Sequence, residues 1–226
     1  SGCFAIEYAE ALDFNRLGAL VIKSLSPTCR AGNPTQRVAD CQGGMLNAIG
    51  IPSHGLDYYL ERVLPPYTRF DTPVVASVSA DTAALFAEAA AALSLPQVAA
   101  IEANISCPNL EADGRAFAVS PQDTFEVLSA IRRQTRHPLW AKLTPNTADL
   151  AAVARAPDAP RAHALALGHP VLGLAPAVRT RQPQLGHVLG RLSGPPTKPT
   201  PLPTLHQCPP PLRPASLPRR GTAPPA

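Results

Sequence analysis

Short apolar runs alternate with helical stretches over the first two thirds of this chain, and this alternation restricts the possible fold more than any other feature. The runs occupy residues 17–24, 72–79, 97–106 and 137–144. Each is short and bounded by turn residues, as expected for strands buried on both faces of a sheet. Strands that alternate with helices predict βαβ units and a parallel sheet.

The stretches between the runs have helix signals. Residues 120–136 begin with Ser120 as the expected N-cap, followed three residues later by Asp123. The same pattern recurs over residues 146–156, where Asn146 is the expected cap. A further helix is predicted over residues 80–94, a further strand over residues 163–168, and a loop over residues 43–55.

The composition changes after the last of these elements. The chain has 226 residues and 28 prolines, of which 11 lie in residues 1–155 and 17 in residues 156–226. The first part has a net charge of −3 and the second part +7, because Asp158 is the only acid of the second part. Prolines at this density prevent helices and central strands. We therefore expect a partial barrel over residues 1–194 and an irregular tail over residues 195–226.

Several function classes are disfavoured by the sequence. Nucleic-acid binding through the basic tail is the weakest hypothesis, because the tail has no aromatic residue on which a base could stack. No run of about 18 apolar residues predicts a membrane span, and no signal peptide is recognisable. The five cysteines form no CxxC pair, which favours reduced thiols and a cytoplasmic location.

Polar residues stand where the predicted strands end. The carboxyl ends carry Lys23, Ser77, Asn104 with Cys107, and Lys142. In parallel α/β folds the working residues lie at this end of the strands. Two lysines, a thiol and a carboxamide would therefore converge on one face.

Each of these residues also has an ordinary structural explanation. A single cysteine after a strand is usually a small buried apolar residue. A lysine at a strand end is usually a solvated charge, and Asn104 and Asn109 could make local turn hydrogen bonds. The combination is more specific than any one member.

A family resemblance rests on eight motifs in order: SGCF, RLGALVIKS, RAGNPTQRV, GGMLNAIGI, NISCPN, WAKLTPN, RTRQP and LSGP. The chain resembles the catalytic subunit of class 1 dihydroorotate dehydrogenase, and its loops resemble the NAD-linked subgroup most. The resemblance implies an α/β fold, a (β/α)8 TIM barrel that is incomplete in this chain. It also implies flavin mononucleotide (FMN) as cofactor and oxidation of dihydroorotate to orotate in pyrimidine biosynthesis.

The resemblance assigns roles to individual residues. The cysteine of NISCPN, Cys107, corresponds to the general base that removes a proton from C5 of dihydroorotate while a hydride leaves C6. No metal ligand is implied. The implied substrate contacts are Lys23, Asn47, Ala48, Ile49, Gly50, Ile51, Asn104 and Asn109. The implied flavin contacts are Ser1, Lys23, Ser24, Asn104, Lys142 and Gly194.

The resemblance also implies partners and shows departures from the family pattern. It implies a homo-oligomer and a separate iron–sulfur, FAD-containing subunit that passes electrons to NAD. Ser77 stands where the family usually has a flavin-contacting asparagine, and His169-Pro170 stands at its Asn-Thr substrate pair. The family's first strand and last two strands, with their glycine-rich phosphate turns, have no clear counterpart. The alternative is therefore an inactive fragment or decayed copy of the same family.

Overall fold

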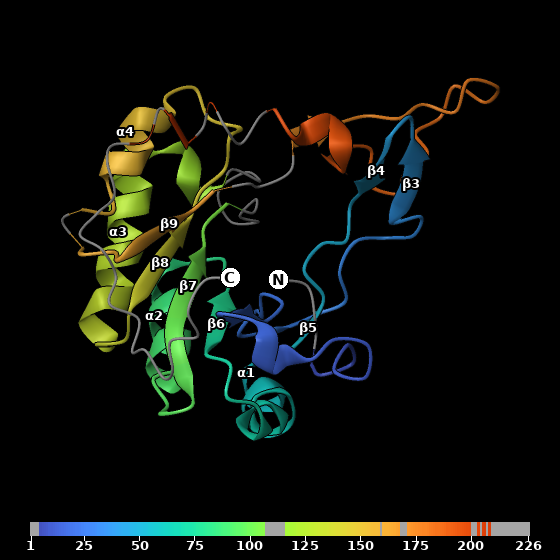
Figure 1. The fold of residues 1–226 in the computed structure, drawn as a ribbon. Coiled ribbons are helices and arrows are strands. Elements are labelled where there is room, and N and C mark those ends of the chain that lie inside the picture. Colours follow the sequence, from blue (N-terminus) through green and yellow to red (C-terminus); the bar gives the residue numbers. More distant parts are fainter. Residues whose placement is uncertain are drawn as a thin grey trace.

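The computed structural model describes residues 5–106, 116–158, 160–167 and 171–199, together with residues 203, 205, 206 and 208. Its centre is a five-stranded sheet in the order β1-β6-β7-β8-β9 (Figure 1). All four pairings are parallel, four of the strands lie inside the four apolar runs, and the fifth lies inside the further strand predicted over residues 163–168. The predicted parallel sheet is therefore confirmed. Its strands are β1 (Leu20–Val21), β6 (Val74–Val78), β7 (Val98–Asn104), β8 (Leu139–Lys142) and β9 (Ala164–Ala166).

Three helices cover one face of this sheet. They are α2 (Ala83–Ala92), α3 (Pro121–Gln134) and α4 (Leu150–Arg155), and each lies in the connection between two neighbouring parallel strands. Figure 1 shows them together on one side of the strands. Because strand order in space follows strand order in the chain, the arrangement is a series of βα units from an incomplete (β/α) barrel.

The helix starts follow the cap residues, with one correction. Ser120 Oγ accepts a hydrogen bond of 3.2 Å from the backbone N–H of Asp123, so the predicted cap of α3 is confirmed. Asn146 does not cap α4, because its side chain is engaged with Thr144 Oγ1 at 3.0 Å. Asp149 caps that helix instead, and its carboxylate accepts from the backbone N–H of Ala152.

The two faces of the sheet have different surroundings. Val74, Ala76 and Val78 of β6 belong to the same buried apolar cluster as Phe86 of α2 and Val127 of α3. Because strand side chains alternate, the residues between them face the opposite, concave side of the sheet. This concave face carries most of the polar groups described below.

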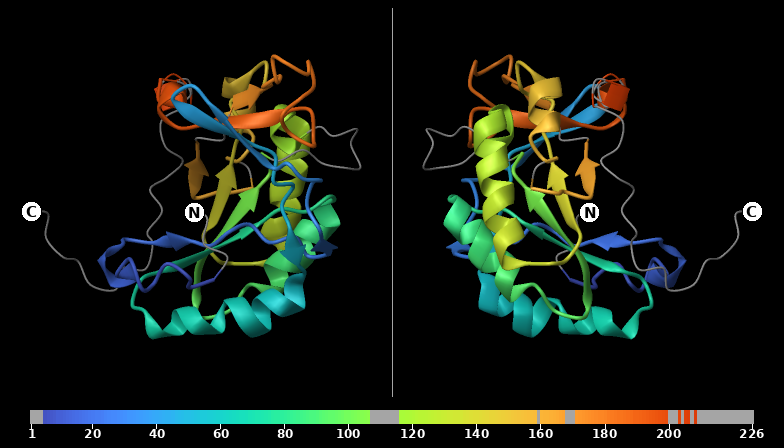
Figure 2. Two further views of the ribbon diagram at one scale, coloured as in Figure 1. Left: turned by 90° about the vertical axis from the view of Figure 1, so that its right-hand side faces the viewer. Right: turned by 90° about the vertical axis from the view of Figure 1, so that its left-hand side faces the viewer.

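A second sheet was not predicted from the sequence. It is antiparallel, in the order β10-β11-β4-β3, and it lies beyond the carboxyl ends of the parallel strands (Figure 2). The predicted loop over residues 43–55 is therefore partly wrong. A two-stranded sheet, β2-β5, is also present. These strands are β2 (Cys29–Arg30), β3 (Val38–Cys41), β4 (Gly44–Asn47), β5 (Ser53–His54), β10 (Val171–Gly173) and β11 (Gly190–Ser193).

Short helices complete the fold, most of them at the amino end of the parallel strands. There Phe14 stacks against Tyr67 and packs against Phe70, with ring centroids 6.3 and 5.0 Å away. These rings shield the start of the parallel sheet from water. The short elements are η1 (Phe14–Arg16), α1 (Leu56–Tyr58), η2 (Tyr59–Val63), η3 (Pro65–Arg69), η4 (Phe117–Val119) and η5 (Pro195–Thr197), of which η2 is a π-helix.

The predicted division at residue 195 is not tested. The element η5 lies just past it, and residues 209–226 lie outside the described residues. In the described part of the chain, no helix is long and apolar enough to cross a membrane. Cys29, Cys41 and Cys208 are free thiols in the described part.

We predict that Ser120→Ala will destabilise the protein by about 1 kcal/mol, because an N–H at the start of α3 loses its acceptor. The matched control is Ser120→Gly, for which the expected loss is only a few tenths of a kcal/mol because glycine leaves that N–H open to water. Urea unfolding followed by circular dichroism measures both. A free energy of unfolding of Ser120→Ala equal to that of the parent would show that the cap hydrogen bond contributes nothing.

Candidate active site

Five polar side chains lie along the carboxyl edge of the parallel sheet. Lys23 and Ser24 follow β1, and Ser77 is the next-to-last residue of β6. Asn104 is the last residue of β7, and Lys142 is the last residue of β8. Asn104 and Lys142 are register partners in neighbouring strands. The structure therefore brings these predicted residues to one edge, as the parallel topology requires.

The segment after β1 stays beside β6 although it is no longer assigned as strand. The Ile22 N–H donates to the Val75 carbonyl at 3.1 Å, and the Leu25 N–H donates to the Ser77 carbonyl at 2.9 Å. These two hydrogen bonds bracket Lys23 and Ser24. Because Ile22 packs in the core under the helices, alternation directs Lys23 toward the concave face.

A buried hydrogen-bond network joins the carboxyl ends of three neighbouring strands, β1, β6 and β7. Asn104 Nδ2 donates to Ser24 Oγ at 2.9 Å, and Ser24 Oγ lies 2.7 Å from Ser77 Oγ. Ser77 Oγ donates to Glu102 Oε1 at 2.7 Å, and Ser106 Oγ donates to Asn104 Oδ1 at 2.6 Å. All five side chains are at most 8% exposed, so water does not compete effectively for these bonds.

The concave face also carries charged side chains and a buried N–H group that has no described hydrogen-bond partner. Glu102 is 4% exposed, and its register partner Trp140 has a buried indole N–H without a hydrogen-bond partner among the described residues. The side chain of Lys142, two residues after Trp140, has no hydrogen bond or ion pair among the described residues, although its backbone pairs with β7 and β9. A buried N–H and a lysine ammonium without described partners are suited to a polar or anionic ligand.

The loop from Asn47 to Ile51 has a conformation held by its neighbours. Asn33 donates two hydrogen bonds to this loop: its backbone N–H donates to the Ile49 carbonyl and its Nδ2 donates to the Ala48 carbonyl, both at 3.1 Å. Gly50 has φ +79°, and a Cβ there would lie 2.4 Å from the Asn33 nitrogen. Only glycine fits that position without displacement of the backbone.

Asn47 and Gly194 belong to the antiparallel sheet rather than to the parallel one. Asn47 Nδ2 donates to the Arg191 carbonyl at 3.2 Å. Gly194, with φ +105°, follows β11 where the backbone passes close to Gly44. Their predicted roles in substrate and flavin binding stay predictions.

Three predicted site residues lie outside the described residues: Ser1, Cys107 and Asn109. Cys107 directly follows Ser106 in the sequence, and its predicted role as the general base stays a prediction. The positions of His169 and Pro170 also lie outside the described part.

Sequence reasoning missed Glu102, Trp140 and Ser106. A signal for Glu102 was available, since a carboxylate in an otherwise apolar strand run (AAIEAN) must find hydrogen-bond donors inside the protein. The indole and the serine hydroxyl gave no comparable signal, because either residue type is common in strands and turns.

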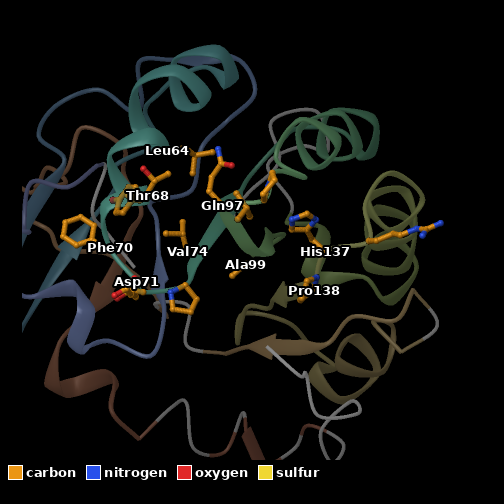
Figure 3. Close-up of a pocket in the computed structure, with 15 residues that line it drawn as sticks. Leu64, Thr68, Phe70, Asp71, Val74, Gln97, Ala99, His137 and Pro138 are labelled. Carbon is orange, nitrogen blue, oxygen red and sulfur yellow. The ribbon is translucent and has the colours of Figure 1, made fainter. Parts of the chain in front are cut away.

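A cavity of about 540 Å³ lies at the opposite end of the sheet (Figure 3). Val74 and Val98 line it where β6 and β7 begin, and Pro138 lines it just before β8. In (β/α) barrels the amino ends of the strands serve stability, whereas catalysis occurs at the carboxyl ends. We therefore place the candidate active site at the carboxyl edge, not in this cavity.

A parallel sheet of βα units with lysine, serine and carboxamide groups at its carboxyl edge defines a (β/α)-barrel enzyme. Comparison with known proteins supplies the family. The family model described as Dihydroorotate dehydrogenase matches residues 1–213, and the chain belongs to this family. Its members are flavin oxidoreductases that oxidise dihydroorotate in pyrimidine biosynthesis.

Curated relatives are 39–41% identical to this chain over the aligned residues. It is 39% identical over 210 residues to the dihydroorotate dehydrogenase B (NAD(+)) catalytic subunit of Listeria welshimeri, covering 92% of this chain and 69% of that protein. The protein of the same name from Geobacillus kaustophilus is 41% identical over 202 residues, covering 88% of this chain and 64% of that protein. The predicted family and its NAD-linked subgroup are confirmed.

A solved structure supports the fold. A dihydroorotate dehydrogenase from Eimeria tenella, in complex with ferulenol, superimposes with a TM-score of 0.67 at 17% identity. The match covers 91% of this chain and 65% of that chain, so the described sheet corresponds to part of a longer fold. The prediction of an incomplete barrel is confirmed.

We predict that Gly50→Ala will destabilise the protein by roughly 1–3 kcal/mol, since alanine is strained at this φ and its Cβ would collide with Asn33. The matched control is Gly18→Ala, because a Cβ at Gly18 would meet nothing within 4 Å. We expect the control to change stability by less than about 0.5 kcal/mol. Urea unfolding measures both, and equal stabilities would refute the strain argument.

Proposed function

We propose that this chain carries the catalytic site of an FMN-dependent dihydroorotate dehydrogenase, with Cys107 as the general base. The observation that supports the proposal is the carboxyl edge of the parallel sheet. There Asn104, Ser24 and Lys142 lie together, and Cys107 follows within three residues of Asn104.

The polar groups of the concave face fit the ring of a flavin. Its edge offers carbonyl oxygens and ring nitrogens, for which Lys23, Lys142 and the Asn104 amide are suitable donors. The phosphate end of FMN has no comparable match, because the parallel sheet ends at β9 in the described residues. We therefore assign ring contacts to this chain and no phosphate contacts, and Ser1 and Gly194 stay predicted flavin contacts.

Ser24 is a special case among the predicted flavin contacts. Its hydroxyl hydrogen is directed to Ser77, because the single hydrogen of Ser77 is used on Glu102. Ser24 would therefore contact a flavin through its backbone, or as an acceptor, rather than as a hydroxyl donor.

The reaction requires removal of a proton from C5 and a hydride from C6 of dihydroorotate, which leaves the C5–C6 double bond of orotate. The thiolate of Cys107 takes the proton and becomes a thiol. FMN supplies the two-electron acceptor for the hydride. The ammonium of Lys142 favours the anionic form of a neighbouring thiol and of an electron-rich ring. Asn104 and Asn109 hold the amide edges of the substrate, and Lys23 and the Asn47–Ile51 loop contact it.

The protein partners of this chain are inferred from the names of its relatives, not from contacts in the structure. The relatives are named catalytic subunits, and their names include NAD(+). We propose that this chain likewise passes electrons to NAD through an iron–sulfur, FAD-containing subunit, and that it forms a homo-oligomer in the cytoplasm. The alternative of a decayed, inactive copy is not favoured, since the edge residues Lys23, Asn104, Cys107 and Lys142 are all present.

The test of the function is flavin binding followed by reduction. Titration of FMN into the purified chain should quench the flavin fluorescence. It should give a yellow protein that keeps the visible absorbance band of the bound flavin. Dihydroorotate added without oxygen should bleach that band and yield orotate in equal amount. Failure of the chain to bind FMN, or bound FMN that dihydroorotate does not bleach, would refute the proposal.

We predict that Cys107→Ser will slow flavin bleaching by a factor of about 10²–10⁴ at neutral pH, the usual contribution of a general base. The reason is acidity, because a free thiol has a pKa of about 8.5 whereas a serine hydroxyl has almost no anionic form. The parent rate should rise with pH, and the variant should recover only at higher pH. Stopped-flow absorbance measures the step.

The matched control for this experiment is Cys29→Ser, because Cys29 is exposed in the small β2-β5 sheet. It should bleach at the parent rate. An unchanged rate and pH profile in Cys107→Ser would mean that this thiol is structural.

A further inference from the structure

The network on the concave face has a fixed direction that starts at Glu102. An ionised carboxylate only accepts hydrogen bonds, so the single hydroxyl hydrogen of Ser77 must point to Glu102. Ser77 oxygen can then only accept from its other neighbour, which makes Ser24 the donor between the two serines. With its hydrogen used in this way, Ser24 oxygen accepts from the amide of Asn104.

This direction determines which way the Asn104 carboxamide is turned. Its Nδ2 must face Ser24, and its Oδ1 must face Ser106, whose hydroxyl donates to it at 2.6 Å. The opposite rotamer would place Oδ1 against a serine oxygen that has no hydrogen left to give. A carboxamide that was free to turn could present either group to a ligand, whereas this one cannot.

We infer that Glu102 is a positioning residue, which fixes the orientation of the Asn104 carboxamide through Ser77 and Ser24. The inference rests on the proposed function for its consequence, namely that substrate and flavin meet the Asn104 amide in a single orientation. Glu102 is buried and lies two residues before Asn104 on β7. It does not contact the substrate in this assignment.

The ability of serine both to accept and to donate a hydrogen bond explains why it can stand at position 77. Ser77 accepts from Ser24 and donates to Glu102, so it transmits direction between them. An asparagine here could do the same, because its oxygen accepts and its amide donates. Alanine could do neither.

The first test observes the side chain itself in the chain without cofactor. Protein labelled with ¹⁵N-asparagine gives an NH₂ signal pair for Asn104, assigned by its loss in Asn104→Asp. We expect Glu102→Gln and Ser77→Ala to shift this pair and to speed its exchange with solvent at least severalfold. Glutamine can donate as well as accept, so it no longer dictates the direction. Ser77→Asn should restore the parent signals.

The matched control is Ser94→Ala, which removes a hydroxyl bonded to Thr135 at the end of α2 and leaves the concave face intact. It should leave the Asn104 pair unchanged. Urea unfolding of each variant establishes that it is folded, and Ser77→Ala decides the question if Glu102→Gln does not fold. An unchanged Asn104 pair in the folded variants would overturn the inference.

The second test measures ligand affinity in the FMN-loaded protein. Orotate should bind Glu102→Gln about tenfold more weakly than the parent, and the control Ser94→Ala with the parent affinity. Parent affinity in Glu102→Gln would overturn the inference while the proposed function stood. If the parent chain does not bind FMN, the proposed function fails, and the Asn104 signals still decide whether Glu102 positions the carboxamide.

Discussion

The pairing of β7 with its two parallel neighbours is the constraint on which the rest of the structure depends. This central strand is buried on both faces, and its register places Glu102 opposite Ser77 on one side and Trp140 on the other. A shift by one residue would turn Glu102 and Asn104 toward the helices and Ile101 and Ala103 toward the polar face. Register and site are therefore determined together.

The concave face combines a structural cost with a functional gain. A buried carboxylate is unfavourable unless donors surround it, and the serines at positions 24 and 77 supply a continuous path of donors. A continuous network of this kind is rigid, because no member can turn without breaking a neighbour's hydrogen bond. The same rigidity gives a catalytic edge groups of fixed orientation.

The sequence predicted the parallel elements well because they are local patterns. Apolar runs identified four strands of the parallel sheet, the strand predicted over residues 163–168 is the fifth, and Ser120 identified the start of α3. The antiparallel sheet was missed because β4 pairs with β11, whose partner residues are more than 140 positions away. Asn146 was assigned as a cap in error, since Thr144 competes for its side chain and local patterns do not resolve such competition.

By itself, the sequence determined the family, the order of strands and helices, and which residues end the strands, because these depend on neighbours along the chain. The tertiary structure alone decided how those ends interact. Ser24 meets Ser77 across 53 positions and Asn104 across 80, so the network exists only once three strands lie side by side. Hydrogen bonds depend on distance and direction in space, and spacing along the chain encodes neither.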